Sequence, residues 1–191
     1  MYIRKKFVIR SGAMRLQEKY KKEVMPAMKE KFGYKNNLSV PRIEKVTINT
    51  GIGKFMQDEK AIEEIVSDLM LISGQKPVFT QAKKAIAGFK IRKGLKVGLM
   101  VTLRGRRAFD FAQRLISLAL PRSRDFRGIE QKSIDTHGNL NVGLKEQIIF
   151  PEISNENIRN IFGMQITLKT TAKTHEEGVE LFKLMGFPIK K

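Results

Sequence analysis

The chain has 191 residues, with 37 Lys and Arg against 19 Asp and Glu, so its formal net charge is +18. Hydrophobic residues make up 41%, which is enough for a core and excludes a basic disordered tail. Without Cys the chain can form no disulfide, thiolate nucleophile or Cys-based zinc site. A positive surplus of this size costs stability through self-repulsion, and its usual use is contact with a polyanion.

Residues 15–32 have apolar side chains at helical spacing, which predicts a first helix that Pro26 kinks or splits. Residues 40–50 alternate and are rich in β-branched residues, as is typical of a strand. Asp58 is expected to begin a second helix, which Gly74 ends.

The middle of the chain predicts strands at residues 76–82 and 96–103, joined by a basic connection at 83–94. A third helix is predicted over residues 107–120 and is expected to stop at Pro121. These elements place two strands in succession before the next helix.

The last third of the chain predicts a hairpin over residues 133–150 that turns at 136–139 and continues as a strand from Leu144. Residues 164–173 form the most regular strand pattern, and residues 174–177 fit a capping box that opens a last helix. A hairpin and successive strands exclude strict βαβ alternation. The predicted fold class is therefore α+β, with two layers: an antiparallel sheet with helices on one face and an open opposite face.

Two predicted strands have a polar face without an acidic residue. Lys45, Thr47 and Asn49 face away from the apolar side of the first strand, and the last strand does the same with Gln165, Thr167, Lys169, Thr171 and Lys173. Such donors can contact phosphates and ribose hydroxyls. A plain solvated face is the alternative and is favoured for the last strand alone, but two such faces favour a sheet that binds RNA.

A stretch from Leu69 to Phe109 contains ten basic residues and no acidic one. A surface built for solubility mixes both signs, so this stretch favours phosphate contact. Lys83 and Lys84 lie among small residues that let an RNA backbone approach. Phe89 either stacks on a base or anchors the loop in the core, and the anchor is the favoured interpretation.

A third basic cluster comprises Arg122, Arg124 and Arg127 around Asp125. Either it contacts phosphate or it forms a local ion-pair network, and the sequence leaves both interpretations open. Residues 1–13 are basic but lack the apolar segment of a secretory signal. We expect them to be a flexible extension of a single domain at residues 14–191, with an organellar presequence or an upstream start before Met14 as alternatives.

Enzyme motifs are weak throughout the sequence. The pair Gly51 and Gly53 lacks the third glycine and the ribose acid of a dinucleotide site. His137 and His175 have no ligand partner at metal-binding spacing. We therefore expect no enzyme, no cofactor and no metal. A membrane surface is the less favoured polyanion, because the basic residues are spread over all elements and no apolar run approaches the roughly 20 residues that span a bilayer.

Several long motifs occur in a family-specific order. They are LISGQKPV at 71–78, QAKKAIAGFKIRKG at 81–94, VTLRG at 101–105, LPRSRDFRG at 120–128, EQIIFPE at 146–152 and TTAKT at 170–174. From about Met14 onward the chain closely resembles the bacterial-type large-subunit ribosomal protein L-five family. It departs at residues 135–139, where Asp-Thr-His-Gly-Asn replaces the usual Asp-Gly-Arg-Gly-Asn, and at Gln165, where an acid is common.

The resemblance implies a structural protein that binds 5S rRNA and helps attach it to large-subunit rRNA in the central protuberance. It implies that the loop at residues 81–93 approaches P-site tRNA, and that residues 133–150 lie toward small-subunit protein S-thirteen at an intersubunit bridge. It also implies a ribosome in the cytoplasm, with an organellar ribosome as the alternative. A structured-RNA-binding protein outside the ribosome is the alternative function.

The candidate binding residues combine the polar faces with the basic stretch. For rRNA they are Thr47, Asn49, Lys76, Thr80, Thr167, Lys169 and Thr171. For tRNA they are Lys83, Lys84, Lys90 and Arg92. A nucleic-acid-processing enzyme would need a cluster of carboxylates to hold metal ions, and the basic stretch offers none.

Overall fold

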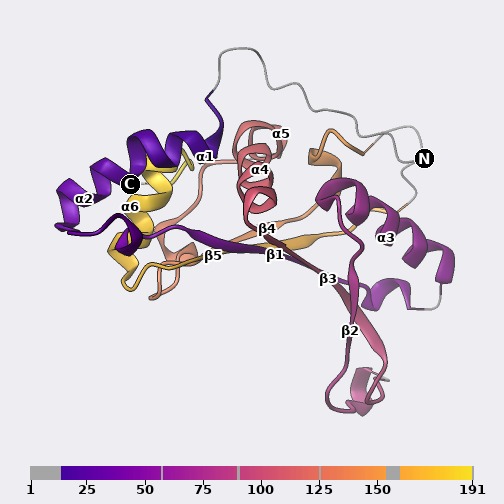
Figure 1. Cartoon of the computed structure of the whole chain (residues 1–191). Coiled ribbons are helices and arrows are strands. Elements are labelled where there is room, and N and C mark those ends of the chain that lie inside the picture. Colours follow the sequence, from indigo (N-terminus) through magenta and orange to yellow (C-terminus); the bar gives the residue numbers. More distant parts are fainter. Residues whose placement is uncertain (1–13, 57, 90, 125, 154–159, 191) are drawn as a thin grey trace.

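The structure is a computed structural model that describes residues 14–56, 58–89, 91–124, 126–153 and 160–190. The expected extension at residues 1–13 lies outside the described residues, as do Lys90 and Asp125. Within the described ranges, five strands form one open sheet with helices against it (Figure 1).

The sheet has the strand order β2-β3-β1-β5-β4, and every neighbouring pair is antiparallel. The strands are β1 (Ile43–Gly51), β2 (Val78–Gln81), β3 (Lys96–Arg104), β4 (Leu140–Leu144) and β5 (Met164–Thr170). This arrangement confirms the predicted α+β class. The first and last strands of the sequence prediction, β1 and β5, are neighbours at the centre of the sheet.

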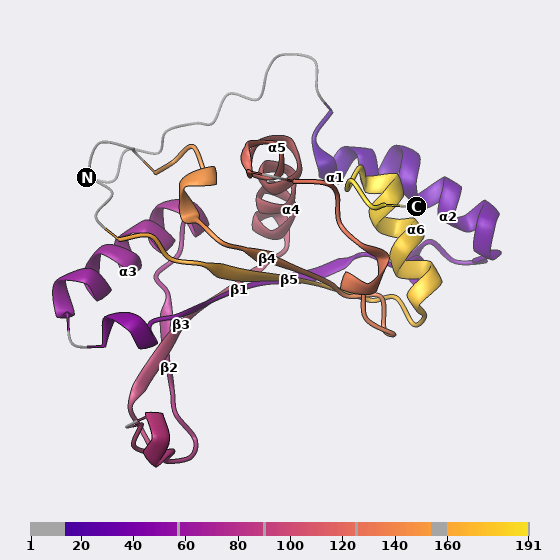
Figure 2. The same cartoon turned by 180° about the vertical axis from the view of Figure 1, so that it is seen from behind.

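The helices form the second layer. They are α1 (Leu16–Lys19), α2 (Met25–Phe32), α3 (Glu59–Ser73), α4 (Arg106–Arg114), α5 (Leu120–Arg122) and α6 (His175–Met185). In both views α1, α2, α4, α5 and α6 lie on one side of the sheet, and α3 lies toward the end from which β2 and β3 project (Figure 1, Figure 2). No described helix covers the opposite face.

The core lies between the two layers because apolar side chains alternate along each strand. Val46 and Ile48 of β1 are buried there, together with Ile166 and Leu168 of β5 and the helix residue Phe111. The other half of each alternation points to the open face. The hydrophobic pattern therefore decides which side chains remain available for a partner.

The predicted helix boundaries are largely confirmed. Asp58 accepts a hydrogen bond from the backbone N–H of Ala61 at 3.1 Å, and Gly74 ends α3 in the left-handed conformation. Thr174 caps α6 by accepting the backbone N–H of Glu177 at 3.3 Å, and Glu177 Oε2 accepts the backbone N–H of Lys173, the residue before the cap, at 2.8 Å.

Neither proline ends or splits its helix. A π-helical turn precedes each one: Tyr20–Val24 leads into α2 with Pro26, and Leu115–Ala119 leads into α5 with Pro121. Proline lacks the N–H of a regular turn, and a wider turn tolerates that loss. The predicted stop at Pro121 is therefore wrong, since the helix continues to Arg122.

The strand predicted from Leu144 onward is also wrong. β4 ends at Leu144, and the chain then enters a 3₁₀ turn at Gln147–Ile149. The buried side chain of Gln147 holds this turn, since its amide donates to the carbonyl of Asn160 at 2.6 Å and accepts from the N–H of Phe162 at 2.9 Å. A buried polar side chain satisfied in this way replaces the ladder that a strand would have used.

Candidate nucleic-acid interface

The strand register aligns polar side chains of the open face into rows that cross the sheet. Thr47 pairs with Thr102 of β3 on one side and with Thr167 of β5 on the other, and Thr167 pairs with Asn141 of β4. The Thr167 hydroxyl donates to Asn141 Oδ1 at 2.7 Å. We call these three threonines and the asparagine that accepts from one of them the hydroxyl row.

A second row flanks the hydroxyl row on the open face. Lys45 pairs with Arg104 of β3 and with Lys169 of β5, so three cations lie side by side across three strands. We call them the basic row. Like charges on neighbouring strands repel, and such an arrangement is suited to an anionic partner.

The third row lies on the other flank and is mostly uncharged. Asn49 pairs with Met100 of β3 and with Gln165 of β5, while Met100 also pairs with Val78 of β2. Val78 is 65% exposed and Met100 is 38% exposed, so this flank offers apolar surface next to two amides. Together the three rows provide cations, hydroxyls and amides over one uncovered surface.

The predicted absence of acidic residues from this face is wrong in one place. The pairing of β1 with β5 shifts between Ile43 and Lys45, which leaves Glu44 as an extra residue in a bulge. Its carboxylate lies 2.9 Å from Lys169 Nζ and 4.0 Å from Arg104 Nη1. Lys169 is therefore an ion-paired member of the predicted rRNA set. The hydrogen bond from Lys169 is the main reason that the pKa of Glu44 is lowered.

The structure brings together only part of the predicted rRNA set. Thr80 is half-buried on β2 at one end of the face, and Lys76 is exposed just before that strand. Thr171 lies beyond the opposite end, where its hydroxyl accepts the backbone N–H of Arg42 at 3.0 Å. Sequence reasoning missed Thr102 and Asn141. Strand alternation in β3 could have found Thr102, whereas the misplaced strand hid Asn141.

The described members of the predicted tRNA-binding set lie on a loop that projects from the body of the protein. β2 and β3 extend past the rest of the sheet and carry this loop at their tip (Figure 1, Figure 2). Lys83, Lys84 and Arg92 are exposed there. Phe89 is 72% exposed, so the interpretation of Phe89 as a core anchor is wrong.

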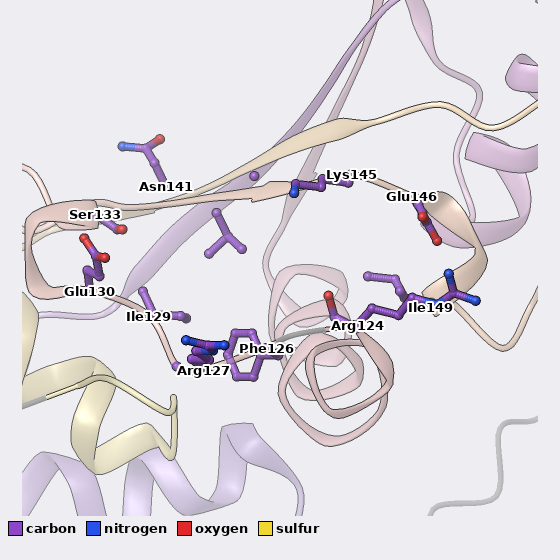
Figure 3. A pocket seen from close by; sticks show the side chains of 14 residues that line it. Arg124, Phe126, Arg127, Ile129, Glu130, Ser133, Asn141, Lys145, Glu146 and Ile149 are labelled. Carbon is purple, nitrogen blue, oxygen red and sulfur yellow. The ribbon is translucent and has the colours of Figure 1, made fainter.

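A groove of about 510 Å³ runs beside β4, the edge strand of the sheet. Arg124, Arg127 and Lys145 line it together with the apolar side chains of Phe126 and Ile129 (Figure 3). Two members of the third basic cluster thus lie at a groove. The alternative ion-pair network would involve Asp125, which lies outside the described residues.

The turn next to this groove is held by Asp135. Its carboxylate accepts the backbone N–H of His137 at 2.9 Å and of Asn139 at 2.7 Å, and the Asn139 side-chain amide at 2.8 Å. Burial raises the pKa of Asp135, but these hydrogen bonds outweigh it and the pKa is lowered overall. Asn139 in turn accepts the N–H of Thr170 at 2.9 Å, which fixes the turn to the end of β5.

Other kinds of site find no support in the described part of the chain. Its His, Asp and Glu residues form no group of three or more that could hold a metal ion. Among the described helices, none combines the length and apolar character needed to cross a bilayer.

Fold and surface define the class: a basic α+β protein whose helix-backed sheet presents hydroxyls and cations on its uncovered face. Comparison with known sequences matches residues 36–92 to the family "Ribosomal protein L5" and residues 96–189 to the C-terminal part of the same ribosomal family. The chain belongs to the ribosomal protein L5 family. This is a structural, non-enzymatic family of the large ribosomal subunit.

Individual relatives match over nearly their whole length. The large ribosomal subunit protein uL5 of Carboxydothermus hydrogenoformans is 52% identical over 177 residues, covering 93% of this chain and 99% of the relative. The uL5 protein of Desulforamulus reducens is 55% identical over 177 residues, with coverage of 93% and 98%. That of Clostridium beijerinckii is 54% identical over 175 residues, with coverage of 92% and 98%.

Proposed function

We propose that this protein binds 5S rRNA through the open face of its sheet and helps attach it to large-subunit rRNA in the central protuberance. The observation that carries this proposal is the hydroxyl row beside the basic row on an uncovered surface. Cations neutralise phosphates and supply affinity, while hydroxyls and amides reach ribose and base edges. Specificity then comes from the fit of a fixed pattern to a folded RNA.

The projecting loop serves a separate contact in this proposal. Lys83, Lys84 and Arg92 are exposed at the end of a hairpin that extends away from the sheet body. We propose that this loop, Lys90 included, contacts P-site tRNA, as the family resemblance implies. Distance from the hydroxyl row supports a division of the two RNA contacts between two surfaces.

The groove beside β4 fits a protein partner. Its lining combines basic, acidic and apolar side chains, with Glu130 and Glu146 beside the three cations, and such a mixture suits a peptide more than a bare phosphate chain. We propose this edge, with the neighbouring turn at residues 135–139, as the contact with small-subunit protein S-thirteen. We also propose that residues 14–191 act as one RNA-binding domain in the cytoplasmic ribosome, since one core joins both halves of the chain.

A gel shift tests the main proposal. The protein is titrated against 5S rRNA and against a scrambled RNA of equal length at physiological salt. We expect at least about tenfold tighter binding to 5S rRNA, because the specific contacts add to a shared electrostatic affinity. Equal affinity for both RNAs would refute 5S rRNA recognition, and tight binding to another folded RNA would favour the structured-RNA alternative outside the ribosome.

A further inference from the structure

Glu44 is the one acidic residue within the five described strands. The bulge in β1 gives it no partner on β5, and a bulge commonly re-aims a side chain. Both of its ion-pair partners, Lys169 and Arg104, belong to the basic row, so its carboxylate lies on the open face. A carboxylate among the residues that would meet a polyanion requires an explanation.

Charge balance within the protein is one explanation. Glu44 offsets the repulsion among three adjacent cations, and its ionised state is stabilised by the hydrogen bond from Lys169. An exposed ion pair of this kind contributes little to stability, because solvent screens it. The same carboxylate also repels phosphate. Charge balance alone would therefore weaken RNA binding for a small gain in stability.

The geometry leaves Glu44 with unused acceptor capacity. Oε2 meets Lys169 Nζ at 2.9 Å, whereas Oε1 lies 4.0 Å from Arg104 Nη1, beyond hydrogen-bond distance. The Glu44 side chain is 39% exposed, so the carboxylate can be reached from the open face. Lys169 holds it in place, so little side-chain freedom is lost when another group binds.

An ionised carboxylate can only accept hydrogen bonds. Phosphate oxygens offer no donor, but ribose 2′-hydroxyls and base amino groups do. We propose that Glu44 accepts a hydrogen bond from such a donor of the bound RNA, and that the basic row holds it in position while contacting phosphates. This inference rests on the proposed RNA-binding function. In it, Glu44 favours RNA groups that donate a hydrogen bond and disfavours phosphate oxygens.

A thermodynamic cycle tests the inference with 5S rRNA as the probe. Nucleotides of 5S rRNA that the bound protein protects from chemical probing are replaced one at a time by 2′-deoxy counterparts or by analogues that lack the base amino group. Affinities are measured for the full-length protein, for Glu44→Ala and for the control Glu63→Ala. Glu63 is exposed on α3, so this control removes an equal charge away from the sheet.

We expect one RNA position at which the unmodified protein loses about tenfold in affinity, as for a hydrogen bond to a charged group. The same RNA modification should reduce the affinity of Glu44→Ala by less than about twofold. It should reduce the affinity of Glu63→Ala as much as that of the unmodified protein. A sensitive 2′-deoxy position identifies a ribose donor, and a sensitive base analogue identifies an amino donor.

If the effects of the Glu44→Ala substitution and of the RNA modification were additive at every RNA position, the role of Glu44 would be overturned. Thermal unfolding of Glu44→Ala checks its fold, and Glu44→Gln provides a second variant that keeps one acceptor oxygen. We expect Glu44→Gln to retain the sensitivity that Glu44→Ala loses, and equal loss in both would also contradict the inference. Failure of the unmodified protein to prefer 5S rRNA over scrambled RNA would instead refute the proposed function.

Discussion

Gly138 and Gly178 approach each other so closely that neither position has room for a side chain. A Cβ on Gly178 would lie 2.4 Å from the Cα of Gly138, and a Cβ on Gly138 would lie 2.6 Å from the Cβ of Ala172. Gly138 also has a φ of +71°, which L side chains rarely adopt. The turn at residues 135–139 is therefore packed directly against the first turn of α6.

Gly178→Ala should destabilise the protein because its methyl group must displace the backbone of the turn. Overpacking of this kind costs about 1–3 kcal/mol, which corresponds to a fall in Tm of about 3–10 °C for a chain of this size. Calorimetry measures the shift. Gly143→Ala is the matched control, since a Cβ there meets nothing within 4 Å. A Tm unchanged in Gly178→Ala would show that the turn moves freely.

Thr47→Val should weaken 5S rRNA binding about fivefold to tenfold and leave Tm almost unchanged. The change keeps the shape of the side chain but removes the hydroxyl at the centre of the hydroxyl row, and a lost hydrogen bond accounts for an effect of about 1 kcal/mol. Filter binding at fixed salt measures it. Ser67→Ala, which removes an exposed hydroxyl from α3, should bind RNA normally. Comparable losses in both variants would argue against the open face as the binding surface.

Lys83→Glu combined with Lys84→Glu should spare 5S rRNA binding and weaken retention of P-site tRNA on the assembled ribosome. The two lysines lie on the projecting loop, so reversing their charge leaves the sheet rows intact. tRNA dissociation rates from purified ribosomes measure the effect. Lys21→Glu with Lys22→Glu makes the same charge change at two exposed neighbours in the helical layer and is the control. Loss of 5S rRNA binding in the loop variant would refute the division between two surfaces.

Asp135 should make stability depend on acid pH. Its pKa in the folded protein is lowered, so its contribution is fully present above the unfolded pKa of about 3.9 and is lost as pH falls through the folded pKa. The difference in unfolding free energy between the unmodified protein and Asp135→Asn should therefore shrink as pH falls below about 4. Urea unfolding at several pH values measures it, with Glu63→Gln as the control for charge. A constant difference would exclude this linkage.

Sequence patterns predicted the elements well where local physics decides them. Alternation in residues 164–173 predicted β5, and the caps at Asp58 and Thr174 placed two helix starts. The errors arose where distant contacts decide the outcome. The strand expected from Leu144 onward does not form, because the Gln147 side chain bonds to Asn160 and Phe162. Phe89 is exposed because its loop projects away from any core.

The candidate site was predicted only in part, for the same reason. Thr47, Asn49 and Thr167 were identified from alternation within single strands, and the structure places them on one face. Thr171 was chosen by the same alternation, but its hydroxyl already accepts a hydrogen bond from the backbone N–H of Arg42. A residue's face follows from its own strand, whereas its hydrogen-bond partners depend on the neighbouring chain.

The sequence by itself determined the excess of positive charge, the α+β class and the family, because these follow from composition, periodicity and local motifs. Only the tertiary structure decided which polar residues form rows, since register between β1, β3, β5 and β4 aligns Thr102, Thr47, Thr167 and Asn141. It also decided that Glu44 joins the open face, because a bulge shifts one residue relative to the neighbouring strand. Pairing across strands is a property of the folded chain, and alternation within one strand cannot specify it.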